Sequence, residues 1–197
     1  GLPPGQQVDW RLGIVNASAD KVKKVLSGKK QVYLLIVNTY KECVIGGQRR
    51  QVDLAVKELG CHFIPLQGVT TVHCEVTRAV ADAYRNLHLF DVRVPRGVDF
   101  YSCAFGRKYP LTTTNAADAI LAQALDTIDY PRVIERLYAD GARIFLEVGP
   151  GSSCTRMISS ILGERPHLAR SFCVAGQDAS VLFLRLLGHC LAEGVRL

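Results

Sequence analysis

The segment Arg143–Met157, RIFLEVGPGSSCTRM, combines residue types that can do chemistry: an apolar strand-like run, a Gly-Pro-Gly turn, and hydroxyl and thiol side chains at a helix start. Such a turn can hold a phosphate through free backbone amides at the helix N-terminus, or present a catalytic group. The segment lacks both the G-x-G-x-x-G spacing and the lysine of a P-loop, and Pro150 removes one amide donor. We therefore predict a packing joint, in which the glycines let strand and helix approach closely.

Two cysteine–histidine pairs, Cys61-His62 and His73-Cys74, raise the question of a zinc site. Neighbouring residues on a strand point to opposite faces of the sheet, so Cys61 and His62 would not face one metal ion. We predict no metal site from these pairs.

The composition is typical of a globular protein and not of a membrane-spanning or secreted one. The 197 residues are 48% hydrophobic and 21% charged, which allows one large domain or two small ones with a real core. No apolar run is long enough to span a membrane, and the start, GLPPGQQVDW, lacks the features of a signal peptide.

Seven cysteines without a C-x-x-C pair indicate free thiols in a reducing cytoplasm. The formal charge of +6 is spread along the chain, so we expect no nucleic-acid partner.

The first third of the chain has a regular alternation of elements. Ser18 is a good helix N-cap, and Gly28 and Gly60 suit the left-handed position past a helix end. The spacing of apolar residues predicts strands at 10–17, 31–38, 42–46 and 62–66 and helices at 19–28 and 48–59. The order βαββαβ is the split βαβ arrangement of ferredoxin-like folds, with both helices on one face of an antiparallel sheet.

The remainder alternates helices with a few strands, which is typical of a parallel α/β layer. Its strands are too few for a free-standing doubly wound sheet, so the parallel sheet looks incomplete. We expect helices at 73–89, 116–125, 130–139, 152–162 and 179–193, strands at 98–103, 145–148 and 170–174, an extended piece at 92–94 and a polar loop at 106–114.

Five segments, taken in order, resemble malonyl-CoA:acyl-carrier-protein transacylases and related acyltransferase domains. They are CVIGG with the helix after it, PLQGVTTVHCEVTRAVADAY, DFYSCAFGRKYPLT, AQALDTIDYPRVIERLYADGARIFLEVGPG, and IFLEVGPGSSCTRMISSIL. The sequences of two segments, VYLLIVNTYKECVIGG and VGPGSSCTRMI, are most similar to acyltransferase domains of polyunsaturated fatty acid and polyketide synthases. The resemblance implies an α/β chain with a ferredoxin-like βαββαβ subdomain at 10–67 and the C-terminal part of an acyltransferase core at 68–197.

The resemblance also implies roles for four residues. His73 stands at the position of the family's catalytic histidine, which passes a proton between a serine hydroxyl and a departing thiolate. Gln123 matches the residue whose main-chain carbonyl holds the other ring nitrogen. Thr70 and Val72, just before the histidine, match positions that line the acyl pocket. The four residues 70–73 match neither the malonyl nor the methylmalonyl pattern of polyketide enzymes, so malonyl is only the default.

The chain departs from the family pattern in one respect: it contains no G-x-S-x-G nucleophile motif. We therefore expect the serine to lie outside this chain, in an N-terminal half of the acyltransferase, and the 197 residues alone to be inactive. Coenzyme A thioester would be the substrate, with no tightly bound cofactor, and phosphopantetheine would be carried by an acyl carrier protein. Ketosynthase and other synthase domains would be further partners. The alternative is a non-catalytic acyltransferase-like module that docks carrier proteins or neighbouring domains.

Overall fold

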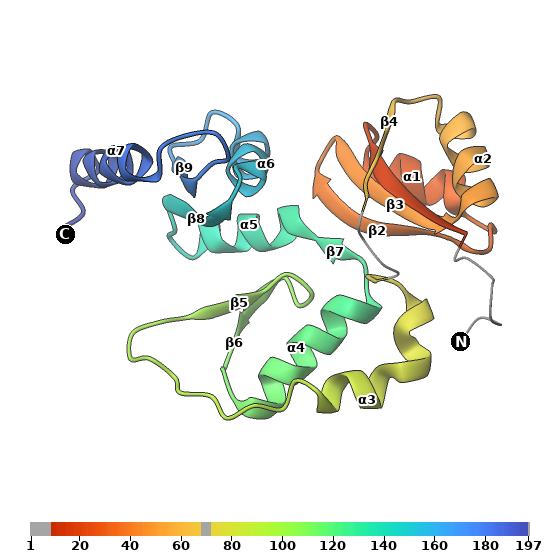
Figure 1. The fold of residues 1–197 in the computed structure, drawn as a ribbon, viewed down its shortest axis with the longest axis horizontal. Helices are drawn as coiled ribbons and strands as arrows, with labels where there is room; N and C mark the ends of the chain where they lie inside the picture. Colours follow the sequence, from red (N-terminus) through yellow and green to blue (C-terminus); the bar gives the residue numbers. More distant parts are fainter. Residues whose placement is uncertain (1–8, 68–71, 197) are drawn as a thin grey trace. The chain divides into compact units, whose positions relative to one another are not determined.

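The computed structural model describes residues 9–67 and 72–196 (Figure 1). By its internal contacts the chain divides into two compact units, Gly1–Val133 and Ile134–Leu197. The division falls within one helix, α5 (Tyr130–Ala139). The boundary that the sequence places after residue 67 stays a prediction. The α/β class predicted from the sequence is confirmed.

The first unit is built around an antiparallel sheet. Its elements are β1 (Trp10–Val15), α1 (Ala19–Leu26), β2 (Val32–Thr39), β3 (Glu42–Gln48), α2 (Arg49–Leu59) and β4 (Phe63–Pro65). The strands lie in the order β4-β1-β3-β2, and each is antiparallel to its neighbours. This order is the split βαβ arrangement. A fifth strand, β7 (Ile128–Asp129), pairs in parallel with β2 and is missing from the sequence prediction because it is only two residues long.

Local signals explain where the two helices of this sheet begin and end. The Ser18 hydroxyl accepts a hydrogen bond from the amide of Lys21 at the start of α1. Gly28 follows α1 with φ +74°, and Gly60 ends α2 with φ +59°, a conformation that costs glycine little. These predicted caps are confirmed.

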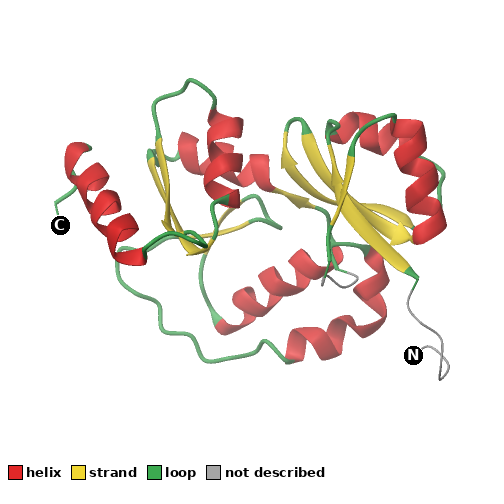
Figure 2. Cartoon of the chain, turned by 45° about the horizontal axis from the view of Figure 1, so that its top comes forward, coloured by secondary structure: helices red, strands yellow, loops and turns green. Residues whose placement is uncertain are grey.

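Apolar residues cover both faces of the sheet. On one face, α1 and α2 lie over the strands and form a core with them (Figures 1 and 2). Its buried members are Val15, Ala17, Val22, Val32, Leu34, Val37, Cys43, Ile45, Val52, Ala55 and Leu59. On the other face, Leu12, Leu35 and Val44 pack with Cys74. The residue that follows His73 is therefore anchored against the sheet.

The segment after His73 differs from the prediction of one helix at 73–89. A 3-10 helix, η1 (Glu75–Val80), comes first, and α3 (Ala81–Asn86) continues from it. Three β-branched residues, Val76, Thr77 and Val80, disfavour a regular α-helix at this point. His73 consequently lies in a turn before the helix and not within it.

The chain after α3 contains one element that the sequence does not predict. At 92–94, where the sequence predicts an extended piece, the chain forms no helix or strand, and Pro95 and Gly97 follow closely. The predicted polar loop contains β6 (Arg107–Tyr109), which forms an antiparallel hairpin with β5 (Phe100–Ser102). The next helix, α4 (Thr113–Leu125), begins at the Thr112 N-cap, and its side chain accepts from the amide of Asn115.

The second unit contains the predicted parallel pair of strands. β8 (Ile144–Pro150) and β9 (Leu168–Cys173) pair in parallel, and α6 (Ser153–Leu162) connects them. The closing helix is α7 (Ala179–Ala192), with Asp178 accepting from two amides at its start.

A carboxylate holds the start of α6, just after the Gly-Pro-Gly residues at the end of β8. Glu147 accepts hydrogen bonds from the amide of Cys154 at 3.2 Å and from the amide and hydroxyl of Thr155, both at 2.7 Å. The helix N-terminus is thus occupied by a side chain of the protein and is not open to a phosphate. A Cβ at Gly149 or Gly151 would meet no described atom within 4 Å, so the prediction that these glycines permit close approach is wrong.

Candidate functional site

His73 has an unusual backbone conformation, with φ +62°. A non-glycine residue seldom takes this left-handed conformation, and it persists where surrounding contacts fix it. Two contacts do so, both at the end of α4. The His73 amide donates to the carbonyl of Ala124 at 2.8 Å, and ring atom Nδ1 lies 2.5 Å from the carbonyl oxygen of Gln123.

These contacts determine the tautomer of the ring. A carbonyl oxygen can only accept, so Nδ1 of His73 carries the hydrogen and donates it to Gln123. In the neutral ring, Nε2 then has a lone pair with which it can take up a proton. The two carbonyls belong to the last turn of α4, whose oxygens have no partners within the helix and form the negative end of its dipole. A ring that becomes positive during proton transfer is well placed there.

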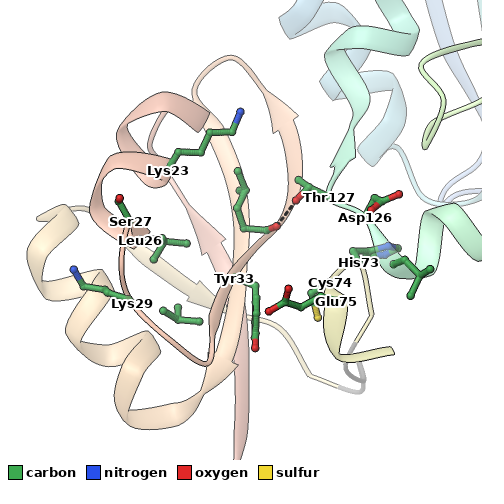
Figure 3. A pocket seen from close by; sticks show the side chains of 13 residues that line it. Lys23, Leu26, Ser27, Lys29, Tyr33, His73, Cys74, Glu75, Asp126 and Thr127 are labelled. Atoms are coloured by element: carbon green, nitrogen blue, oxygen red, sulfur yellow. Dashed lines mark hydrogen bonds between the residues drawn. The ribbon is translucent and has the colours of Figure 1, made fainter. Parts of the chain in front are cut away.

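His73 lies at one end of a cavity of about 510 Å³ within the first unit (Figure 3). Four stretches of chain contribute to it: the C-terminal half of α1 with the residues after it, the start of β2, the His73 turn, and the link from α4 to β7. The lining residues are Lys23, Leu26, Ser27, Lys29, Val32, Tyr33, Leu34, His73, Cys74, Glu75, Leu125, Asp126 and Thr127.

A hydrogen bond fixes the two sides of this cavity. The Thr127 hydroxyl donates to the carbonyl of Leu34 at 2.7 Å (Figure 3), next to the parallel pairing of β7 with β2. The residues that precede Thr127 lead directly from Gln123 and Ala124. The carbonyls that hold His73 are thereby tied to β2 of the sheet.

Cys74 and Tyr33 are groups in this cavity whose pKa is shifted. Burial raises the pKa of the Cys74 thiol and Glu75 adds to this, while a backbone hydrogen bond with Val76 opposes it. Burial also raises the pKa of Tyr33, and Glu75 and Cys74 raise it further. Both groups are therefore neutral near pH 7. Cys74 is 5% exposed and protonated, so it is unsuited to act as a nucleophile beside His73.

The structure brings together two of the four residues singled out in the sequence. His73 and Gln123 are in contact through the Gln123 main chain. Val72 is half-buried and does not line the cavity, and Thr70 lies outside the described residues. The catalytic and substrate-binding roles of all four stay predictions.

Sequence reasoning missed the lining residues Lys23, Tyr33, Glu75 and Asp126. No local pattern marks them, because they come from separate stretches of chain that meet only in the folded unit. Residues 9–67 and 72–196 hold no group of three His, Cys, Asp or Glu side chains able to share a metal ion. Within the same residues, no helix has the length and apolar character needed to cross a bilayer.

Comparison with known proteins supports the resemblance seen in the sequence. No family model matches the chain. Among curated proteins, it is 22% identical over 199 residues to one of the polyunsaturated fatty acid synthase subunits of Thraustochytrium sp., and the match covers 94% of this chain and 10% of that protein.

Solved structures share the fold over nearly the whole chain. The acyltransferase domain from the second module of the salinomycin polyketide synthase matches with a TM-score of 0.83 and 19% identity, over 98% of this chain and 46% of that one. A malonyl-CoA:acyl carrier protein transacylase from Clostridium perfringens matches with a TM-score of 0.74 and 19% identity, over 95% and 61%. The chain therefore has the fold of one part of these acyltransferases, and it spans about half of their length.

Proposed function

We propose that this chain is the histidine-bearing part of an acyltransferase, which moves a malonyl-type acyl group from coenzyme A to the phosphopantetheine of an acyl carrier protein. The observation that carries the proposal is the His73 ring, held through Nδ1 by the Gln123 carbonyl at one end of a 510 Å³ cavity. The shared fold with solved malonyl transacylases and polyketide acyltransferase domains supports the same assignment.

The nucleophile of this reaction is a serine from a segment outside the 197 residues. The support for this is the lack of a G-x-S-x-G motif in the sequence, together with the half-length match to the solved acyltransferases. We assign that segment to an N-terminal half of the acyltransferase, and residues 10–67 and 68–197 to its ferredoxin-like subdomain and the C-terminal part of its core. Ketosynthase and other synthase domains are the proposed neighbours, in the cytoplasm.

The proposed reaction has two balanced halves. In the first, the serine oxygen attacks the thioester carbonyl of acyl-coenzyme A and its proton passes to Nε2 of His73. The C–S bond breaks, and the coenzyme A thiolate leaves with that proton. In the second half, Nε2 takes the proton of the carrier's thiol, whose sulfur attacks the serine ester. The serine oxygen leaves and regains a proton from the ring.

A replacement of His73 tests the proposal in the full-length polypeptide that contains this chain. His73→Ala should lower kcat for acyl transfer at least about 100-fold, since general acid–base catalysis contributes roughly that factor or more. His88→Ala is the matched control, because the His88 Nδ1 atom also lies on a backbone carbonyl, that of Tyr84 at 2.7 Å, yet the ring does not line the cavity. Equal rates for both variants would reject the proposal and favour the docking module.

A further inference from the structure

We propose that Lys23 on α1 and Ser27, the residue after α1, bind the phosphate of a 4′-phosphopantetheine arm, whose sulfur end reaches His73 through the cavity that all three residues line. The inference rests on the proposed function, which supplies the arm. The same phosphate occurs in coenzyme A and in the prosthetic group of a carrier protein, so the site serves either source.

Lys23 is the cation of this cavity that is available to a ligand. Lys29 also lines it, but its ammonium group lies 2.8 Å from a Glu58 carboxylate oxygen and donates to the carbonyl of Val25. Lys23 makes no ion pair or hydrogen bond with any of the described residues, and its side chain is exposed. Ser27, four residues further along the chain and directly after α1, places an exposed hydroxyl on the same side.

The charges of the cavity give the arm a direction. The α1 side contributes Lys23, whereas the opposite side contributes the carboxylates of Glu75 and Asp126, on either side of His73 (Figure 3). A phosphate is attracted to the first side and repelled from the second. The neutral thioester end of the arm then lies beside the imidazole of His73.

The surface between these two ends suits the arm itself. Leu26, Val32 and Leu34 offer apolar contact, and the neutral Tyr33 hydroxyl can exchange hydrogen bonds with an amide. Pantetheine has the same mixture, with two amides and a dimethyl group along a flexible chain. Each part of the arm thus meets a chemically matched part of the cavity.

The test compares donors with and without the phosphate, in the full-length polypeptide. We expect Lys23→Gln to lower the ratio of kcat/KM for acyl-coenzyme A to kcat/KM for acyl-pantetheine about tenfold, since one charged hydrogen bond is typically worth that factor. The ratio of kcat/KM for the acyl-carrier protein to kcat/KM for acyl-pantetheine is measured in the same way. If Lys23→Gln lowers the ratio for only one of the two phosphate-bearing donors, the site is assigned to the phosphate of that donor. Lys23→Arg keeps the charge and should retain most of the ratio.

The matched control is Lys24→Gln, which removes the same charge from the neighbouring residue of α1, exposed and outside the cavity lining. It should leave both ratios unchanged. An unchanged ratio in Lys23→Gln would overturn the inference. The inference would also be overturned if Lys24→Gln lowered the ratio as much as Lys23→Gln does, and only with the acyl-carrier protein as donor. That result would indicate that both lysines bind an acidic surface of the carrier protein.

The outcome separates this inference from the proposed function. If His73→Ala abolishes transfer from acyl-pantetheine while Lys23→Gln leaves the donor ratios unchanged, only the phosphate site fails. If His73→Ala leaves transfer from acyl-pantetheine intact, the proposed function fails with it.

Discussion

At the scale of single residues, the main finding is that the His73 ring is oriented by a main-chain oxygen and not by a carboxylate. The Gln123 carbonyl holds Nδ1, and the Ala124 carbonyl holds the His73 amide. A carbonyl supplied by the backbone is insensitive to the identity of its side chain. Substitutions of His73 and of Gln123 should therefore have different effects on acyl transfer.

Gln123→Ala should therefore lower kcat for acyl transfer by less than about tenfold, far less than His73→Ala, because alanine keeps both the helix and the carbonyl. The measurement is kcat of the two variants of the full-length polypeptide. A loss as large as that of His73→Ala would show that the Gln123 side chain itself acts in the reaction.

Cys43 allows a pH-dependent prediction at the same scale. It is fully buried on β3, and burial raises the pKa of its thiol to about 11 from 9.0, with Asp129 and Glu42 adding to the shift and Lys23 opposing it. The folded state thus keeps a proton between pH 9 and 11 that the unfolded state releases. The free energy of unfolding should fall as the pH rises through this window.

Cys43→Ala removes this titration, so the difference in unfolding free energy between the natural protein and the variant should shrink from about pH 9 to about pH 11, the window set by that pKa shift. Urea unfolding at several pH values measures it. A difference that stays constant over this range would contradict the burial of the thiol.

At the scale of elements, α6 depends on a cap that comes from the strand before it. Glu147 on β8 accepts three hydrogen bonds from Cys154 and Thr155. Burial disfavours its charged form, but the hydrogen bonds from Thr155 and Cys154 outweigh this and lower the pKa of the carboxyl group. The turn is therefore stabilised by a carboxylate at the positive end of the helix.

Glu147→Gln should destabilise the protein by about 1 kcal/mol at pH 7, a typical value for a helix cap. Because the folded state lowers the pKa of Glu147, the carboxylate stabilises the protein at pH values above the pKa of the unfolded state. This stabilisation disappears as the pH falls through the pKa of the folded state. The free energies of unfolding of the variant and the natural protein should therefore become equal in strong acid. Urea unfolding at pH 7 and at about pH 3 measures both. Ser160→Ala, an exposed change on the same helix, is the control. An equal difference at both pH values would contradict this account.

The elements that the sequence predicts well have local causes. The βαββαβ order follows from β-branched runs and from caps such as Ser18 and Gly60. The sequence does not predict the short β6 and β7, because each is two or three residues long and is defined by a partner strand. The φ of His73 depends on a carbonyl 50 residues away, and the Lys23 side of the cavity depends on the fold of the whole unit. No local pattern specifies either.

At the scale of the whole molecule, large apolar side chains are exposed in both units. Leu87 and Phe90 are 71% and 67% exposed in the first unit, and Val148 and Leu184 are 82% and 66% exposed in the second. Exposed apolar surface of this kind marks sites that bind other protein. It agrees with the proposal that a further segment completes the acyltransferase.

The 197 residues expressed alone should therefore bind a hydrophobic dye and associate with themselves more than the full-length polypeptide does. They should also release no coenzyme A from malonyl-coenzyme A. Dye fluorescence, size-exclusion chromatography and thioester hydrolysis measure these properties. Hydrolysis by the 197 residues that His73→Ala abolishes would refute the proposal that the nucleophile lies elsewhere.

The two restraints on His73 share a single origin, the final turn of α4. If that turn frays, the ring loses its tautomer and its backbone loses its fixed φ at the same moment. Alignment of the imidazole is therefore an all-or-none property, and any partner that tightens or loosens this helix end would act as an on–off control of proton transfer.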